Sequence, residues 1–296
     1  MKKVSYTIIL FYKFTRIKNP EVFKIQQRKI AEKFNLKGRM LIAKEGINAT
    51  FEGTTKDIKA YIKKQKSFGS AQDKQIFKDV VFKDSVGNGN GFTKLMVKTR
   101  PEVITLGVGE LNVKRDTAPM ITATQLEKMY QKNEDFVVLD LRNDFEIQAG
   151  YFEKTVNPGL RFFRDLPLKV KELEHLKNKK VVAVCTGDIR VEKATAFLKR
   201  EGFTNLYQLK DGIYSYMKKY PGKRFKGTLF TFDNRMVTPV VEGVKREVVG
   251  KCFDCKKPCE EFYNDDSVRP SKKVICCERC IQKYKNKLRP AIPAHV

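Results

Sequence analysis

The stretch "VVAVCTGDIR", residues 181–190, decides how the central part of this chain folds. It begins with four apolar residues, three of them valine, and then reaches Cys185. A six-residue loop that starts at this cysteine ends on Arg190, and "VEKATAFLKREG" (191–202) follows with the apolar spacing of a helix. A short β-branched run of this kind is typical of a buried strand. The sequence therefore predicts a strand, a tight loop and a helix, with Cys185 at the carboxyl end of the strand.

Similar segments on both sides of this stretch predict a parallel sheet. "DFVVLDLR" (135–142) and "NLYQLKDG" (205–212) have the composition of strands, and "PLKVKELEHL" (167–176) and "IYSYMKKY" (213–220) that of helices. Thr122 with Gln125, and Thr124 with Glu127, fit the capping box that starts a helix. Alternating strands and helices indicate an α/β unit over residues 121–222, with helices on both faces of its sheet. Such sheets bind ligands beyond the carboxyl ends of their strands, where Cys185 is expected.

The loop itself has the residues that a reactive cysteine needs. A thiolate is the nucleophilic form of cysteine. Backbone N–H groups in a tight loop, the start of a helix and the charge of Arg190 all favour an anion there. The alternative is a buried, inert cysteine. We interpret the loop as an anion-binding cradle whose catalytic residues are Cys185 and Arg190. The rest of the candidate active-site loop is Thr186, Gly187, Asp188 and Ile189.

The first hundred residues predict a different domain. Their apolar patterns indicate, in order, a strand, a helix, two short strands, a helix and two more strands: 4–12, 19–34, 38–43, 48–53, 54–64, 79–84 and 93–99. The order β-α-β-β-α-β is the ferredoxin-like, or acylphosphatase-like, α+β pattern, and the extra strand would lengthen one edge. Residues 101–120 contain proline and glycine and little periodicity, so they are expected to form a linker.

Charge points to a polyanionic partner. Lys and Arg number 60 against 34 Asp and Glu, a net charge of +26. Residues 1–66 contain 17 basic and 5 acidic side chains (+12), whereas residues 121–216 contain 16 and 14 (+2). The alternative is a general compositional bias toward lysine, which would not concentrate the positive charge in the N-terminal part of the chain. We therefore predict that residues 1–100 bind RNA, with the candidates Lys37, Arg39 and Lys44.

The apolar runs also bear on location. The longest of them are far too short to span a bilayer, so we expect a cytoplasmic protein without membrane contact. No feature of the sequence identifies a protein partner.

Six of the seven cysteines lie in the last part of the chain, residues 223–296. Cys252 with Cys255 and Cys277 with Cys280 form two Cys-x2-Cys pairs, separated by 21 residues. Two such pairs predict a structural Zn²⁺ site, which would stabilise a segment too poor in apolar residues for its own core. A redox centre and a set of unliganded thiols are the alternatives. Cys259 and Cys276 are surplus, and either could replace a neighbouring ligand.

These motifs resemble known families. Asp140-Leu-Arg142 with Glu146, followed by the Cys185–Arg190 loop, is similar to a rhodanese domain, in which Asp140 and Arg142 would have supporting roles. A Cys-x4-Arg loop in that family suits a cysteine persulfide. "GRMLIAKEGINATFEG" (38–53), "CTGDIRVEKA" (185–194) and "FKGTLFTFDNRM" (225–236), followed by the cysteine-rich tail, resemble the rhodanese-related tRNA uridine(34) hydroxylases over nearly the whole chain.

The resemblance implies an activity. That family hydroxylates the wobble uridine of certain tRNAs to 5-hydroxyuridine with molecular oxygen as co-substrate, and its chemistry depends on the loop cysteine. This chain has Asp188 and Val191 where the family usually has a second glycine and a second cysteine, and Tyr151 where rhodanese domains often have histidine. A sulfurtransferase that carries a persulfide and a catalytically silent RNA-binding homologue are the rival functions.

Overall fold

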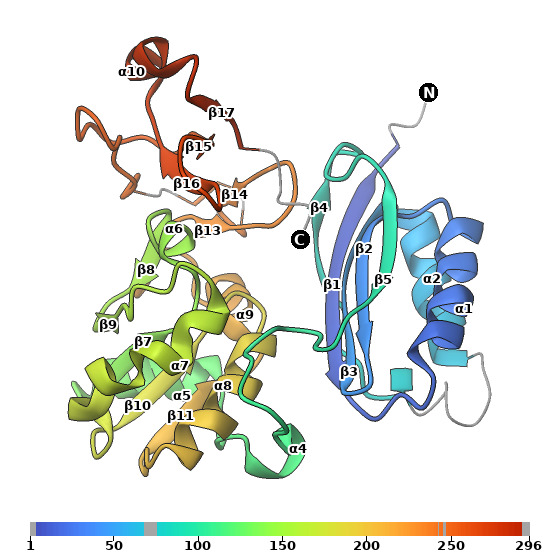
Figure 1. Cartoon of the computed structure of the whole chain (residues 1–296), viewed down its shortest axis with the longest axis horizontal. Helices are drawn as coiled ribbons and strands as arrows, with labels where there is room; N and C mark the ends of the chain where they lie inside the picture. Colours follow the sequence, from blue (N-terminus) through green and yellow to red (C-terminus); the bar gives the residue numbers. More distant parts are fainter. Residues whose placement is uncertain (1–3, 68–75, 242, 245–246, 292–296) are drawn as a thin grey trace. The chain divides into compact units, whose positions relative to one another are not determined.

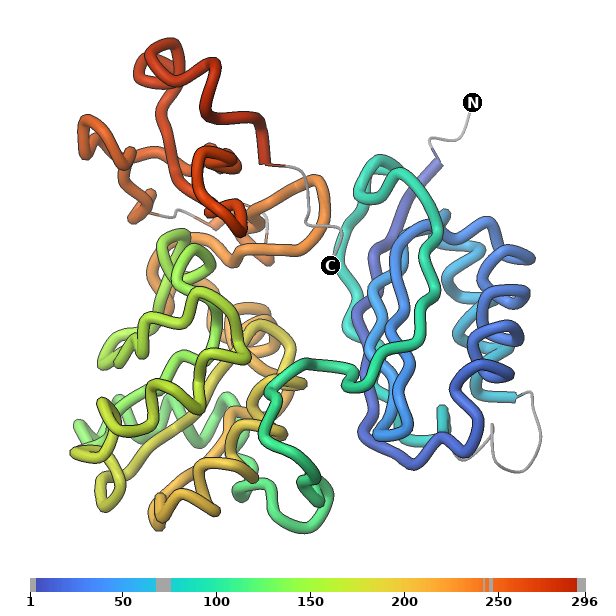
Figure 2. Tube along the Cα trace, in the orientation of Figure 1, coloured from blue at the N-terminus to red at the C-terminus, as the bar shows by residue number. Residues whose placement is uncertain are grey.

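The computed structural model describes residues 4–67, 76–241, 243–244 and 247–291. The chain divides into two compact units, Met1–Thr105 and Leu106–Val296, which are described separately below. Figure 1 labels their helices and strands, and Figure 2 traces the chain. Among the described residues, no helix has the length and apolar character needed to cross a membrane.

The first unit is a five-stranded sheet with two long helices on one face (Figure 1). The strand order is β4-β1-β3-β2-β5, and β5 pairs in parallel with β2 while the other pairs are antiparallel. This arrangement confirms the ferredoxin-like prediction, including the extra strand at an edge. The elements are β1 (Tyr6–Phe14), α1 (Pro20–Lys33), β2 (Lys37–Ala43), β3 (Gly46–Thr54), α2 (Thr55–Ser67), β4 (Lys83–Gly87) and β5 (Leu95–Thr99).

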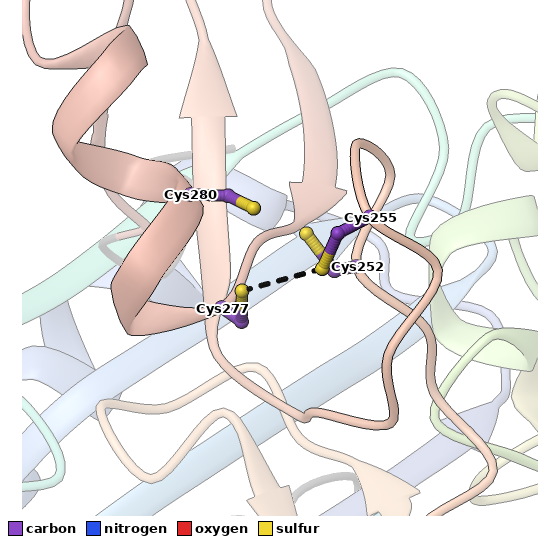
Figure 3. Close-up of side chains that lie close together, drawn as sticks. All are labelled: Cys252, Cys255, Cys277 and Cys280. Atoms are coloured by element: carbon purple, nitrogen blue, oxygen red, sulfur yellow. Dashed lines mark hydrogen bonds between the residues drawn. The ribbon is translucent and has the colours of Figure 1, made fainter.

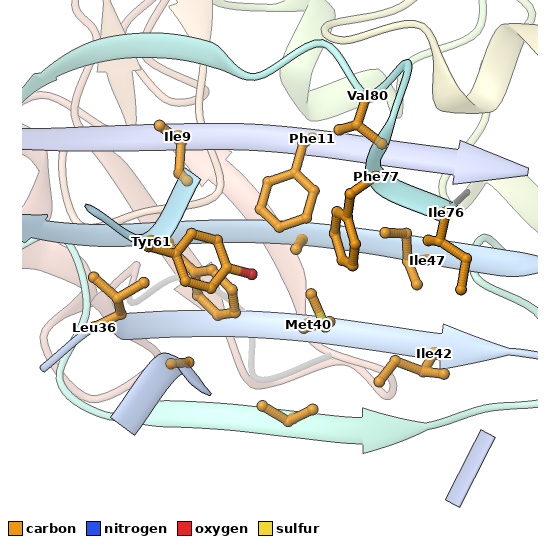
Figure 4. Packing of buried hydrophobic residues seen from close by; sticks show 14 of the residues in the cluster. Ile9, Phe11, Leu36, Met40, Ile42, Ile47, Tyr61, Ile76, Phe77 and Val80 are labelled. Carbon is orange, nitrogen blue, oxygen red and sulfur yellow. The ribbon is translucent and has the colours of Figure 1, made fainter. Parts of the chain in front are cut away.

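The core of this unit lies between the sheet and its helices (Figure 4). Ile9 and Phe11 of β1, Met40 of β2 and Tyr61 of α2 are fully buried there. Alternate residues of each strand point to this face, so the residues between them face away from the helices. The strand predicted at 79–84 begins only at Lys83, because the preceding turn directs its apolar side chains into this core.

A five-stranded, all-parallel sheet forms the centre of the second unit, in the order β6-β11-β10-β7-β9. It confirms the predicted rhodanese-type α/β architecture. The segment predicted as one helix at 167–176 is a short α-helix followed by a 3-10 helix. The elements are α4 (Val113–Asp116), β6 (Met120–Ile121), α5 (Ala123–Gln131), β7 (Val137–Asp140), α6 (Asp144–Ile147), β8 (Gly150–Phe152), β9 (Thr155–Val156), η1 (Phe163–Asp165), α7 (Leu166–Lys169), η2 (Val170–Leu176), β10 (Val181–Val184), α8 (Ile189–Arg200), β11 (Leu206–Leu209) and α9 (Gly212–Lys219).

The cysteine-rich tail is built of short elements that pack on this centre. β12 pairs with β8, and β15 forms a small antiparallel sheet with β16 and β17. Its apolar cluster includes Phe145 and Ala149 from the segment around α6, so the tail shares its core with the rhodanese part. The elements are β12 (Phe225–Gly227), β13 (Leu229–Phe230), β14 (Val237–Thr238), β15 (Phe262–Asp265), β16 (Lys272–Ile275), α10 (Glu278–Ile281), η3 (Gln282–Tyr284) and β17 (Leu288–Pro290).

Candidate active site

Cys185 follows the last residue of β10 and is 1% exposed. Its Sγ accepts a hydrogen bond from the Asp188 N–H at 3.2 Å, so the loop curls back over the sulfur. The Cys185 carbonyl oxygen accepts from the Ile213 N–H at 2.9 Å, which ties the loop to the start of α9. Gly212 makes this contact possible: it has φ +72°, and a Cβ there would lie 2.7 Å from the Cys185 carbonyl oxygen. The loop is therefore held on both sides of the sulfur.

Arg190 is paired with the carboxylate of Glu146, a residue of the motif for which the sequence predicts no role. Both of its terminal nitrogens donate to Glu146, with Nη2 2.8 Å from Oε2, and the carboxylate is completely buried. Burial disfavours the charged guanidinium, but the Glu146 charge outweighs it and raises the pKa of Arg190. No local pattern of the sequence predicts this contact, because the two residues lie 44 positions apart. Arg190 is thus half of a buried ion pair that braces the loop.

The supporting residues form a second buried pair. Asp140 and Arg142 are both fully buried, with Oδ2 and Nη2 2.6 Å apart. The same Nη2 donates to the Gly150 carbonyl oxygen at 2.7 Å, and Nη1 donates to the carbonyl oxygen of Glu146. This pair therefore holds the backbone segment that presents Glu146 to Arg190.

Asp188 occupies a backbone conformation that is unusual for a residue other than glycine. Its φ is +86°, in the left-handed region that glycine adopts without a steric penalty. The side chain is 2% exposed, and its Oδ2 accepts from the Asp211 N–H at 3.2 Å. Asp188 therefore turns its side chain toward the start of α9 rather than into solvent.

The tail cysteines gather at one place (Figure 3). The Sγ atoms of Cys252, Cys255, Cys277 and Cys280 all lie within 4.8 Å of one another, and those of Cys255 and Cys277 are 3.6 Å apart. Zn–S bonds of about 2.3 Å in a tetrahedron put the sulfurs about 3.8 Å apart. The four thiols therefore fit a metal ion in number, chemistry and spacing.

The thiols of the tail also differ in acidity. Burial opposes ionisation of Cys252, but backbone N–H groups, first that of Cys277 and then that of Cys255, lower the pKa of Cys252 to about 6. Cys259 and Cys276 lie outside the cluster, and burial raises the pKa of each to about 12. Burial also raises the pKa of Cys280, which belongs to the cluster. The position of the sulfurs, rather than their acidity, therefore favours the four clustered cysteines over the two alternates.

The RNA-binding candidates belong to the first unit. Lys37 and Arg39 are two residues apart on β2, so they share the face of the sheet that points away from the helices. Lys44 follows β2 in the turn to β3. Lys37 and Lys44 are exposed, and Arg39 is half-buried.

Comparison with known proteins agrees with this architecture. Three family descriptions match in chain order: the UPF0176 acylphosphatase like domain over residues 6–103, the rhodanese-like domain over 122–219 and the rhodanase C-terminal over 226–291. Among solved structures, a rhodanese-related protein from Thermoplasma volcanium is 27% identical, covering 34% of this chain and 93% of its own, with a TM-score of 0.30. The fold and the Cys185–Arg190 loop define a rhodanese-type protein with an acylphosphatase-like domain before it.

Curated relatives narrow this class to one family. The tRNA uridine(34) hydroxylase of Aster yellows witches'-broom phytoplasma is 37% identical over 98% of this chain and 93% of its own length. The proteins of the same name from Bacillus cytotoxicus and Staphylococcus carnosus are 35% and 32% identical, over 95% and 96% of this chain and 86% and 92% of their own lengths. The chain belongs to the tRNA uridine(34) hydroxylase family.

Proposed function

We propose that this protein hydroxylates uridine 34 of tRNA to 5-hydroxyuridine, with Cys185 as the reacting thiol. The observation that carries the proposal is the match to hydroxylases of this name over nearly the whole chain, combined with the buried Cys185 at the ligand-binding edge of a parallel sheet. Molecular oxygen as co-substrate follows from the family resemblance.

The contacts around Cys185 support a reaction at its sulfur. Glu146 pairs with Arg190, and the Asp188 side chain accepts from the Asp211 N–H. The Asp188 N–H remains directed at the sulfur and stabilises negative charge that develops on it.

The four clustered cysteines are proposed to hold one Zn²⁺. Zinc favours four thiolate ligands in its structural sites, and a site with all four positions filled by protein leaves none for substrate. The ion would therefore stabilise the tail rather than take part in the reaction. Cys252, Cys255, Cys277 and Cys280 are the proposed ligands.

The first unit is proposed to bind the tRNA through basic residues that include Lys37, Arg39 and Lys44. Support comes from the concentration of positive charge in residues 1–66 and from the position of these three residues on or beside β2. A tRNA substrate also makes the cytoplasm the proposed location.

The function is tested in a strain that lacks the endogenous enzyme and carries this protein. Mass spectrometry of tRNA nucleosides should show 5-hydroxyuridine with the unchanged chain and none with Cys185→Ser. The matched control is Cys259→Ser, which alters a buried cysteine outside both sites and should keep the modification. Thiolated uridine in place of 5-hydroxyuridine would instead support a sulfurtransferase. The absence of any modification by the unchanged chain would support a silent RNA-binding protein.

A further inference from the structure

Among the described residues of the first unit, helices cover only one face of the sheet. Strand β1 alternates between the core, to which it sends Ile9 and Phe11, and the other face, where Leu10, Tyr12 and Phe14 lie. We call this other side the open face. The strand register extends it as two rows, which run Lys83, Leu10, Thr50, Arg39, Met96 and Tyr12, Asn48, Leu41, Lys98.

Two aromatic rings lie together on the open face. The ring centroids of Tyr12 and Phe14 are 6.2 Å apart, and the rings meet edge to face at 73°. Both side chains are half-buried, so part of each remains accessible to solvent. The Nζ of Lys83 lies 5.3 Å from the centroid of the Tyr12 ring. The face therefore combines aromatic surface with a positive charge that lies over one of the two rings.

Further positive charge surrounds these rings. Arg39 and Lys98 lie in the two rows, and Lys37 lies two residues before Arg39 on β2. A surface with aromatic rings and several cations suits a polyanion whose bases are accessible.

Glu52, an acidic residue next to these rows, is bound by backbone N–H groups. Glu52, opposite Lys37, is 2% exposed, and its carboxylate accepts hydrogen bonds from the N–H groups of Asn88, Gly89 and Gly91. These hydrogen bonds fix the glycine-rich loop at 87–91 over one end of the open face. The loop lies close above the Tyr6 ring, since a Cβ on Gly89 would be 2.8 Å from it.

From this juxtaposition we propose that the open face binds unpaired bases of the tRNA substrate by stacking on Tyr12 and Phe14. Lys37, Arg39 and Lys98 contact the phosphates on either side. The inference rests on the proposed function for the identity of the RNA. Its chemistry is that of single-stranded RNA, because bases inside a duplex cannot reach an aromatic ring on a sheet.

The test exploits the absence of tryptophan from the chain. Tyr12→Trp gives a single fluorophore on the open face, and Phe14→Trp gives a second variant in case the first does not fold. The control is Phe34→Trp, a half-buried aromatic at the end of α1 on the helix side of the same unit. Each variant is titrated with single-stranded poly(U) while fluorescence anisotropy of labelled poly(U) follows binding.

We expect saturating poly(U) to quench most of the emission of Tyr12→Trp or Phe14→Trp and to leave that of Phe34→Trp unchanged. Replacing both rings by leucine should weaken binding by about 5- to 150-fold, the range that corresponds to stacking of one base. Binding of an RNA duplex should not change. Equal quenching of the control, binding without quenching or no binding of poly(U) would each overturn the proposal.

The nucleoside assay in the complemented strain separates this proposal from the proposed function. A chain that restores 5-hydroxyuridine but shows no quenching keeps its function and loses this binding site. A chain that shows quenching but does not restore 5-hydroxyuridine keeps this binding site and loses the proposed function.

Discussion

At the scale of single residues, the carboxylate of Glu146 determines how the Cys185 loop is braced. Glu146 is fully buried, and both terminal nitrogens of Arg190 donate to it. Removing one member of a buried ion pair leaves the other charge without compensation, at a cost of about 3–5 kcal/mol. We therefore expect Glu146→Ala to lower the free energy of unfolding by about that amount, as measured by urea denaturation.

The double variant provides the control for this prediction. Glu146→Ala combined with Arg190→Met removes both charges, and it should recover a large part of the lost stability because no buried charge is left unpaired. A single Glu146→Ala variant within about 1 kcal/mol of the unchanged chain would show that the pair does not brace the loop.

We predict that Asp188 influences the reactivity of Cys185. Its N–H donates to Sγ, and its carboxylate lies inside the loop. Asp188→Asn removes the charge, keeps an oxygen acceptor for the Asp211 N–H and retains a residue that tolerates positive φ. We expect iodoacetamide to alkylate Cys185 several-fold faster at a fixed neutral pH, because a nearby negative charge opposes the thiolate. Mass spectrometry of the Cys185 peptide measures the rate. A slower or unchanged rate would mean that the carboxylate does not act on the sulfur.

At the scale of elements, helix α6 joins the active site to the cysteine-rich tail. Phe145 packs in the tail's cluster, with its ring centroid 5.0 Å from that of Phe230, while the next residue, Glu146, holds Arg190. Disorder in the tail should therefore displace Phe145, and with it the adjacent Glu146 that holds the Cys185–Arg190 loop.

Removal of the proposed zinc tests this connection. The purified protein should contain about one zinc per chain, and Cys277→Ser should abolish binding because a structural site needs all four thiolates. The metal-free protein should lose protection of β15–β17 from proteolysis and most of its hydroxylation activity. Elemental analysis, limited proteolysis and the nucleoside assay measure these effects. Cys276→Ser alters a thiol outside the cluster and should keep the metal. Loss of zinc from this variant would mean that Cys276 is one of the ligands.

The elements also show what the sequence could reveal. The β-branched run before Cys185 and the two Cys-x2-Cys pairs are local patterns, and they predicted the strand, its loop and the group of four thiols. The partnership of Glu146 with Arg190 joins residues 44 positions apart, and no local pattern determines such a contact. The pairing of β12 with β8 was not predicted either. The two strands are far apart in the sequence, and each is too short to show a recognisable strand pattern.

At the scale of the whole molecule, positive charge is unevenly distributed along the chain. Residues 1–66 have a net charge of +12, whereas residues 121–216 have +2. Each phosphate that a protein neutralises releases counterions, so binding through the first unit should weaken steeply with salt. The Cys185 loop, with its paired Arg190, should contribute little to that dependence.

A matched pair of triple variants tests where the tRNA phosphates bind. Replacing Lys37, Arg39 and Lys44 by alanine should weaken binding of any tRNA and flatten the slope of log K against log salt by about two to three units. The control replaces the same number of charges on the exposed surface of α2, at Lys56, Lys59 and Lys63, and should leave the slope nearly unchanged. Both variants change the net charge equally, so a difference between their slopes reports position rather than total charge. Equal slopes in the two variants would mean that tRNA binds elsewhere, and the basic cysteine-rich tail would then be the next surface to test.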